Sequence, residues 1–190
     1  MNPRVFVLTL CTFAFGSAAF IFAGLLEEMA KDLGVSTAVA GQLQTAYVLT
    51  SALLGPVAAW ILGRLDRKSV VIAGLVLSII LHLACSLAPN FQTLLVFRAF
   101  AGLAGAMSGP AASVAAASLV PPERRGSALA MVSGGMTLAF VVGIPLGSIV
   151  GSIFDWRATF LVAASLSTIA LVGVVFFLPR VPAPPKREGG

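Results

Sequence analysis

The stretch Gly63-Arg64-Leu65-Asp66-Arg67-Lys68-Ser69 decides the fold of this chain. It places four charges within seven residues, and an apolar run long enough to cross a membrane lies on each side of it. Hydrocarbon holds no water to solvate such a cluster, so these residues must lie outside the membrane, in a tight turn between two helices. Three cations in one short loop are typical of the cytoplasmic side of a membrane protein.

The composition is that of an integral membrane protein. Of the 190 residues, 58% are hydrophobic and 10% are charged, whereas a soluble domain carries about 25% charged residues. A net charge of +5 can indicate nucleic-acid binding, but here the cations are spread over short loops between apolar runs. We therefore interpret them as setting the orientation in the membrane. Cys11 and Cys85 lie inside apolar runs, and we interpret them as small core residues rather than a disulfide or metal pair.

Hydrophobicity predicts six membrane-spanning helices outward from this loop. Their approximate ranges are 4–26, 42–62, 70–87, 93–119, 128–149 and 158–178. Together they predict one transmembrane domain over residues 1–178 and a disordered cytoplasmic tail over residues 179–190, which is rich in proline. A signal peptide cleaved after Ser17-Ala18-Ala19 is an alternative interpretation of the first segment, which the continuing apolar run disfavours.

The distribution of Lys and Arg predicts the orientation of the six helices. With the amino terminus inside, nine cations lie in inner segments, and only Lys31 and Arg157 lie in outer ones. This bias, with an even number of spans, predicts that both termini are cytoplasmic.

Arg98 is the one charged residue inside a predicted span. An ionisable side chain in the membrane is a candidate functional residue. In the alternative interpretation Arg98 snorkels to the outer surface, which the turn at Pro89-Asn90 marks. His82 is the only histidine and has no carboxylate near it in the sequence, so we interpret it as a packed or lipid-adjacent residue.

A stripe of small residues runs along the fifth segment at a spacing of four. Its members are Gly135, Ala139, Gly143, Gly147 and Gly151. Small side chains let a neighbouring helix approach closely in lipid, and Pro145 within the stripe can kink the helix. Two interpretations remain open: ordinary tight helix packing, or a mobile interface helix of a transporter.

A membrane serine protease is a further possibility to weigh. Ser108 lies within Gly105-Ala106-Met107-Ser108-Gly109, one position off a nucleophile motif, and His82 is the sole histidine available as its base. We therefore expect no enzyme, no cofactor and no metal site.

An ordered set of motifs carries a resemblance to a known family. The set consists of Gly24-Leu25-Leu26, Ala40-Gly41-Gln42, Ala46-Tyr47, Gly63-Arg64-Leu65-Asp66-Arg67, Arg98 with Gly102, Val120-Pro121-Pro122-Glu123-Arg124-Arg125-Gly126, Gly143-Ile144-Pro145-Leu146-Gly147, and Trp156-Arg157 with Phe160. The chain resembles the amino-terminal half of a major facilitator superfamily transporter, of the bacterial sugar-efflux and drug-efflux (proton antiporter) branch. The resemblance implies an all-α fold of two inverted three-helix repeats.

The resemblance also implies roles for particular residues. Gly63, Asp66 and Arg67 correspond to a gating loop that latches the two halves of a transporter on the cytoplasmic side. Arg98 matches an arginine linked to proton coupling. The motif of Gly143, Pro145 and Gly147 is expected at the interface between halves. A substrate and proton pathway near the midplane would include Phe20, Tyr47 and Thr137 together with Arg98.

Three departures from the family pattern stand out. Gly63 lies one residue too close to Asp66, and Ser69 stands where a glycine is expected. Helix one has Ala18-Ala19-Phe20 where relatives often carry an acidic residue. The family has twelve helices, and six are predicted here.

The resulting expectation is a transporter half in the bacterial inner membrane. It would export small drug-like or sugar-like molecules by alternating access, coupled to protons, as a dimer with itself or with a second six-helix half. The alternative is a non-transporting membrane module, either regulatory or inactive.

Overall fold

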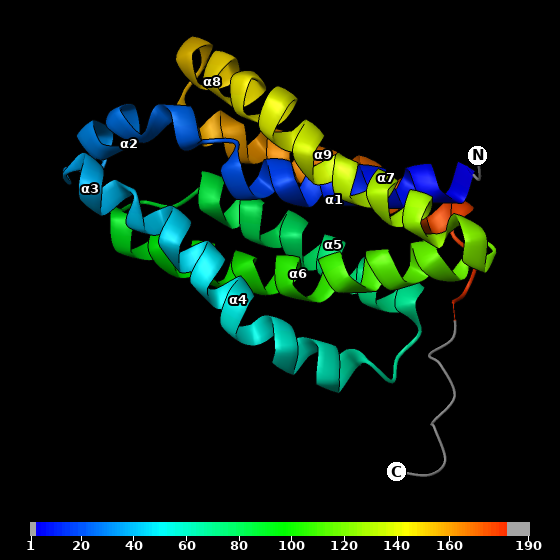
Figure 1. The fold of residues 1–190 in the computed structure, drawn as a ribbon. Coiled ribbons are helices and arrows are strands. Elements are labelled where there is room, and N and C mark those ends of the chain that lie inside the picture. Colours follow the sequence, from blue (N-terminus) through cyan, green and yellow to red (C-terminus); the bar gives the residue numbers. More distant parts are fainter. Residues whose placement is uncertain (1–2, 182–190) are drawn as a thin grey trace.

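The computed structural model describes residues 3–181 of this chain, and in them it shows a bundle of long helices (Figure 1). The elements, in chain order, are α1 (Pro3–Phe20), η1 (Ala23–Leu25), α2 (Leu26–Asp32), α3 (Thr37–Ala40), α4 (Gln42–Leu62), α5 (Arg67–Ser86), α6 (Phe91–Ser118), η2 (Pro122–Arg124), α7 (Arg125–Leu138), η3 (Ala139–Gly143), α8 (Ile144–Ile153) and α9 (Trp156–Phe177). The η3 segment is a turn of π-helix.

Within residues 3–181, six helical stretches are long and apolar enough to cross a membrane. They are Pro3–Asp32, Thr37–Leu62, Arg67–Ser86, Phe91–Ser118, Pro122–Ile153 and Trp156–Phe177. The prediction of an all-α fold with six spans is therefore confirmed. The ranges agree with the predicted ones because lipid thickness fixes the length of each apolar run and the charged turns fix its ends.

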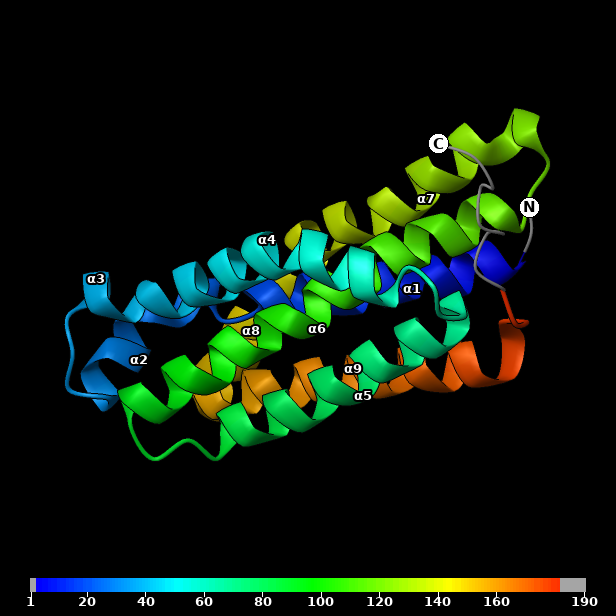
Figure 2. The same ribbon diagram turned by 90° about the horizontal axis from the view of Figure 1, so that it is seen from below.

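The connections alternate between the two ends of the bundle. The amino terminus, the α4–α5 loop, the α6–α7 turn and the end of α9 lie at one end, and the α2–α3, α5–α6 and α8–α9 turns lie at the other (Figures 1 and 2). Side-chain caps begin several helices. Asp66 accepts a hydrogen bond from the Ser69 amide, Asn90 from the Thr93 amide and Asp155 from the Arg157 amide. Such polar caps satisfy amide groups at the first turn of each helix.

Helix α1 lies at the centre of the bundle, in contact with α6, α7 and α9. Helix α5 packs between α6 and α9, whereas α4 lies mainly on α6. Alanines on the buried face of α6 keep these helices close; they are Ala104, Ala111, Ala112, Ala115 and Ala116. The second and fifth spans are the least enclosed. In the 18-residue apolar stretch of each span, 11% is buried in Thr37–Leu62 and 22% in Pro122–Ile153, against 67% in Pro3–Asp32.

The small-residue stripe of the fifth span packs against the first span of the same chain. A Cβ on Gly135 would meet Thr12, one on Gly143 would meet Ser17, and one on Gly147 would meet the carbonyl oxygen of Ile21. The glycines of the stripe thus take part in ordinary tight helix packing within this chain, one of the two interpretations given above, and the role of Gly143, Pro145 and Gly147 at an interface between halves stays a prediction. The spacing of four predicts a close approach of helices but does not identify the partner helix.

The packed part of the chain extends beyond residue 178, the predicted start of the tail. Val181 is buried, its amide donates to Asp66 Oδ1 at 2.7 Å, and its carbonyl accepts from the Arg67 amide at 2.9 Å. Residues 179–181 thus lie against the α4–α5 loop. The rest of the predicted tail, residues 182–190, is outside the described residues.

Candidate functional site

A groove of about 630 Å³ lies between α4 and α7, with α1 and α6 also contributing to its wall. Its lining includes the aromatic rings of Phe15, Phe20 and Tyr47 and the hydroxyl-bearing residues Thr12, Ser51, Ser113, Ser133 and Thr137. Most of these residues fall near the middle of their helices, so the groove lies near mid-height of the bundle. None of the residues that line it is charged.

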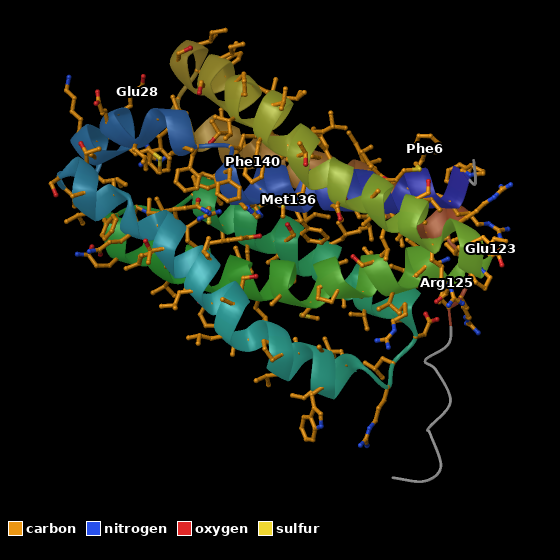
Figure 3. The ribbon with its side chains drawn as sticks, in the orientation of Figure 1. Phe6, Glu28, Glu123, Arg125, Met136 and Phe140 are labelled. Carbon is orange, nitrogen blue, oxygen red and sulfur yellow. The ribbon has the colours of Figure 1, made fainter. Side chains whose placement is uncertain are left out.

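The structure brings together three of the four residues predicted for a substrate pathway. Phe20, Tyr47 and Thr137 all line the groove. The ring of Phe20 also lies 4.8 Å from that of Phe140, centroid to centroid. Met136 lines the groove as well, and Figure 3 shows Met136 and Phe140 along the α7–η3 segment near α1. The fourth predicted residue, Arg98, lies one layer deeper.

Two glycines of α6 position Tyr47 on the groove wall. A Cβ on Gly102 would collide with the Tyr47 carbonyl oxygen, and one on Gly105 would lie 2.7 Å from the Tyr47 hydroxyl. Because these positions lack side chains, the backbone of α4 packs closely against α6. The Tyr47 side chain is consequently buried, with 6% of its surface exposed.

Arg98 is fully buried and bonds to the broken end of α1. Its guanidinium donates from Nη1 to the Ala18 carbonyl and from Nη2 to the Ala19 carbonyl, each at 2.9 Å. Helix α1 ends at Phe20, so these last-turn carbonyls lack the intrahelical partners they would otherwise have. Complete burial excludes the alternative in which Arg98 snorkels to the surface.

The charge of Arg98 is stabilised without a carboxylate. The guanidinium carbon lies 4.6 Å from the ring centroids of both Phe22 and Tyr47. All seven Asp and Glu residues of the chain lie outside the hydrophobic spans predicted from the sequence. Two aromatic faces and the negative end of the α1 dipole therefore take the place of a counter-ion.

His82 lies in the interior and does not line the groove. It is 1% exposed, so it is packed rather than lipid-adjacent. Its Nε2 lies 3.3 Å from the Ala18 carbonyl oxygen that also accepts from Arg98, and its Nδ1 lies 2.6 Å from the Ser78 carbonyl oxygen. Ser108 is buried between α5 and α6 opposite Gly74, and within residues 3–181 no hydrogen bond joins it to His82.

The residues predicted to form a gating loop are engaged within this bundle. Asp66 Oδ2 accepts from the Ser69 amide at 3.0 Å and from the Ser69 hydroxyl at 3.1 Å. Arg67 donates from Nη2 to the Gly63 carbonyl at 3.1 Å. Lys68 was not singled out from the sequence, yet its Nζ donates to the carbonyls of Val175 at 2.9 Å and Leu178 at 2.6 Å, at the end of α9.

A polar cluster at the opposite end ties the first span to the sixth. Arg157 Nη1 lies 2.8 Å from Asp32 Oδ2, which also accepts from Trp156 Nε1 at 3.0 Å. The Arg157 guanidinium carbon lies 4.1 Å from the Trp156 ring centroid. The Trp156-Arg157 motif therefore has a bonding partner that the sequence analysis did not identify, Asp32.

Sequence reasoning also missed the partners of Arg98. Phe22, the carbonyls of Ala18 and Ala19, and Gln44, whose Oε1 lies 3.5 Å from Arg98 Nη2, were not predicted. No proline interrupts α1 near residue 20, so the sequence has no strong mark of the helix break that frees these carbonyls. A buried arginine without a carboxylate does, however, require carbonyl or aromatic partners of this kind.

The chain thus forms a bundle of six helices long and apolar enough to cross a membrane, with an uncharged groove and a buried arginine behind it. The chain belongs to the Major Facilitator Superfamily, whose sequence profile matches residues 8–190. It is 35% identical over 183 residues to a protein of Bacillus subtilis (strain 168) described as the uncharacterized MFS-type transporter YfhI, covering 94% of this chain and 46% of that protein.

The fold agrees with that of a solved structure. That crystal structure is described as a bacterial homolog to the human lysosomal transporter Spinster, in an inward-facing and unoccupied conformation. The likeness has a TM-score of 0.84 at 20% identity and covers 98% of this chain and 45% of the other. The present chain thus spans about half the length of both proteins it matches, and its fold is that of half a major facilitator bundle.

Proposed function

We propose that this chain forms one half of a secondary transporter that exports small organic molecules by alternating access. A second six-helix bundle, either another copy or a separate half, would supply the opposite wall of the groove. The observation that carries the proposal is the groove itself, which lies between the two least enclosed spans and gathers Phe20, Tyr47 and Thr137 at mid-height.

The chemistry of the groove favours uncharged amphipathic substrates. Aromatic rings provide apolar surface for ring systems, while the hydroxyls of Ser51, Ser133 and Thr137 offer donors and acceptors. Arg98 lies behind Tyr47 rather than in the lining, so its charge acts on the site through the tyrosine ring and the end of α1. Drug-like and sugar-like molecules both fit this description.

The proposed orientation places both termini in the cytoplasm of a bacterial cell. The support is the excess of Lys and Arg at the end of the bundle that holds the α4–α5 loop and the α6–α7 turn. Export coupled to inward proton flow would then use the proton gradient of the inner membrane.

Flux measurements in liposomes test the proposal. Liposomes holding this chain together with its second half, with a pH gradient, should accumulate a fluorescent amphipathic probe. Tyr47→Phe, which keeps the ring over Arg98 but loses the hydroxyl, and Thr137→Val should lower the rate severalfold. Ser165→Ala is the matched control, because Ser165 is an exposed serine of α9 whose hydroxyl bonds only to the Leu161 carbonyl of its own helix.

Equal flux for Tyr47→Phe, Thr137→Val and the unmodified chain would contradict the assignment of the groove. No flux with any partner or probe, in protein that is inserted and folded, would favour the alternative of a non-transporting module.

A further inference from the structure

We propose that His82 is the proton-binding group of this bundle, and that its protonation displaces the Arg98 guanidinium from the end of α1 toward the groove. The proposal deepens the proposed transport function by naming the residue that takes the proton. It starts from the shared acceptor: the Ala18 carbonyl faces both His82 Nε2, at 3.3 Å, and Arg98 Nη1, at 2.9 Å.

The contacts of the imidazole define where a proton would bind. Both ring nitrogens face backbone carbonyl oxygens, which only accept hydrogen bonds, and Nδ1 also lies 3.3 Å from the Ser78 hydroxyl. A neutral imidazole has one N–H, and the short contact of 2.6 Å to the Ser78 carbonyl assigns that hydrogen to Nδ1. The lone pair of Nε2 then points toward the Ala18 carbonyl. Only the imidazolium form donates to both oxygens, so Nε2 is the atom that a proton would occupy.

Arg98 is the charged group that faces His82 among the described residues. Helix α1 contributes the Ala18 carbonyl, α9 contributes the Phe160 ring, and α5 itself contributes the carbonyl and the hydroxyl of Ser78, which in turn contacts the Ser167 hydroxyl. Two other titratable side chains lie in this region: Cys85, three residues after His82 on α5, and Tyr47 of α4, whose ring centroid is 4.6 Å from the guanidinium carbon of Arg98. No carboxylate forms a salt bridge with Arg98 or His82 among residues 3–181.

Two cations on one carbonyl in a buried site repel each other strongly, because little water screens them. The guanidinium docked on Ala18 and Ala19 and the protonated imidazole are therefore mutually exclusive. When a proton binds Nε2, the new N–H takes the Ala18 carbonyl and Arg98 moves away. When Arg98 docks again, the proton leaves. The proton is transferred between water and Nε2, and no other bond is made or broken.

The direction of the Arg98 movement follows from its remaining partners. The guanidinium carbon lies 4.6 Å from the Tyr47 ring centroid, and Gln44 Oε1 lies 3.5 Å from Nη2. Both residues belong to α4, the helix that forms one wall of the groove. Protonation would thus bring a cation to the groove wall, and deprotonation would withdraw it. No carboxylate of residues 3–181 forms a salt bridge with either group, so in this exchange the imidazole itself takes the proton.

The composition of the chain gives a direct test, because it contains one histidine and one tyrosine. The full 190-residue chain, labelled with 13C and 15N in these two residue types and placed in lipid nanodiscs, gives one imidazole and one phenol ring to follow by NMR. Near neutral pH we expect the tautomer with hydrogen on Nδ1. On acidification the ring should become imidazolium, and the Tyr47 ring signals should shift with the same midpoint.

Variants separate the proposed exchange from unrelated effects of acid. In Arg98→Gln, the neighbouring charge is removed, so the midpoint of the His82 titration should change. In His82→Asn the Tyr47 shift should disappear. The control is Ser86→Ala, one turn further along α5, where the hydroxyl bonds to the Leu83 carbonyl and the Tyr47 shift should persist.

Three results would overturn the proposal: an imidazole that stays neutral until the bundle unfolds, a midpoint unchanged by Arg98→Gln, or a Tyr47 shift that survives in His82→Asn. If His82→Asn does not fold, the comparison of the unmodified chain with Arg98→Gln decides the matter alone. The readout is independent of transport. Linked His82 and Tyr47 titrations without flux would contradict the proposed function only, whereas flux with unlinked titrations would contradict only the role of His82.

Discussion

At the scale of single residues, Arg98 holds the core of the site together. A guanidinium has five N–H donors in a planar fork, and here the fork spans two consecutive carbonyls while both faces of the plane are covered by aromatic rings. These partners offset the desolvation free energy of the buried charge. The two carbonyls at the end of α1 lack a helical N–H donor, and the aromatic rings carry a negative π face. One orphaned atom remains, Arg98 Nε, which has no hydrogen-bond partner among the described residues.

Substitution of Arg98 should therefore affect stability as well as transport. Arg98→Ala leaves two buried carbonyls without donors, and we expect it to lower the free energy of unfolding by at least about 1–3 kcal/mol. Arg98→Lys keeps the charge but loses the fork and the stacking, so it should recover part of both stability and flux. Arg64→Ala is the control, since Arg64 is exposed in the α4–α5 loop. Thermal unfolding in mild detergent measures the effect, and equal stability of Arg98→Ala and Arg64→Ala would contradict it.

The contacts of Asp66 and Lys68 lead to a second prediction, at the end of the bundle that holds the α4–α5 loop. Asp66 caps α5 and holds the Val181 amide, and Lys68 donates to carbonyls at the end of α9. Asp66→Ala should cost about 0.5–2 kcal/mol, the usual effect of losing an N-cap, and should release the segment that follows α9. Lys68→Met should destabilise the last turn of α9. Limited proteolysis after residue 178 reports the release, and cleavage no faster than in the unmodified chain would contradict it.

At the scale of elements, the first span explains what the sequence predicts and what it does not. Its length and its end near the acidic residues follow from hydrophobicity alone. The break after Phe20 does not, because the partner that stabilises it, Arg98, is about 80 residues away in the chain. The π-turn at η3 precedes Pro145, which has no amide hydrogen to continue the helical bonding, so a disturbance there was predictable but its form was not. Local pattern thus determined the spans, and contacts between distant segments determined the site.

The glycines of α8 allow a prediction at the same scale. A Cβ at Gly147 would collide with the Ile21 carbonyl, whose backbone belongs to the turn after α1. Gly147→Ala should therefore push α8 away from this turn and destabilise the bundle by about 1–3 kcal/mol. At Gly134 of α7 an added Cβ meets nothing within 4 Å, so Gly134→Ala should be neutral or slightly stabilising in a helix. Equal unfolding temperatures of the two variants would contradict the packing of the stripe on the first span.

At the scale of the whole molecule, orientation is open to a labelling experiment. Cys11 and Cys85 are both fully buried, so they give little background with a membrane-impermeant thiol reagent. A cysteine introduced at Lys31 should react in intact cells, and one introduced at Arg64 should react only after permeabilisation, because the sequence predicts nine of the eleven loop and terminal cations on the same side as Arg64. Reaction of the Arg64 position in intact cells would reverse the topology.

The last prediction concerns what covers the groove. Thr37–Leu62 and Pro122–Ile153 flank it and bury little of their surface, and large apolar side chains such as Val48, Val141 and Trp60 remain exposed on them. The stripe Gly135 to Gly151 is occupied by the first span, so a partner bundle must meet the opposite face of α7 and α8 together with α4. A groove with hydroxyls cannot open to lipid without leaving those groups unsatisfied, which requires a second wall.

We therefore expect the transporting unit to contain two six-helix bundles, as a dimer of this chain or a pair with another half. Native mass spectrometry from mild detergent should show the pair, and Val48→Trp, which enlarges a side chain on the rim of the groove, should weaken it while the thermal stability of the isolated bundle is kept. Ile169→Trp is the matched control, since Ile169 is exposed on α9, on the far side of α1 from the groove. A strictly monomeric chain that carries flux in liposomes would refute this argument, because one bundle would then form both walls of the pathway.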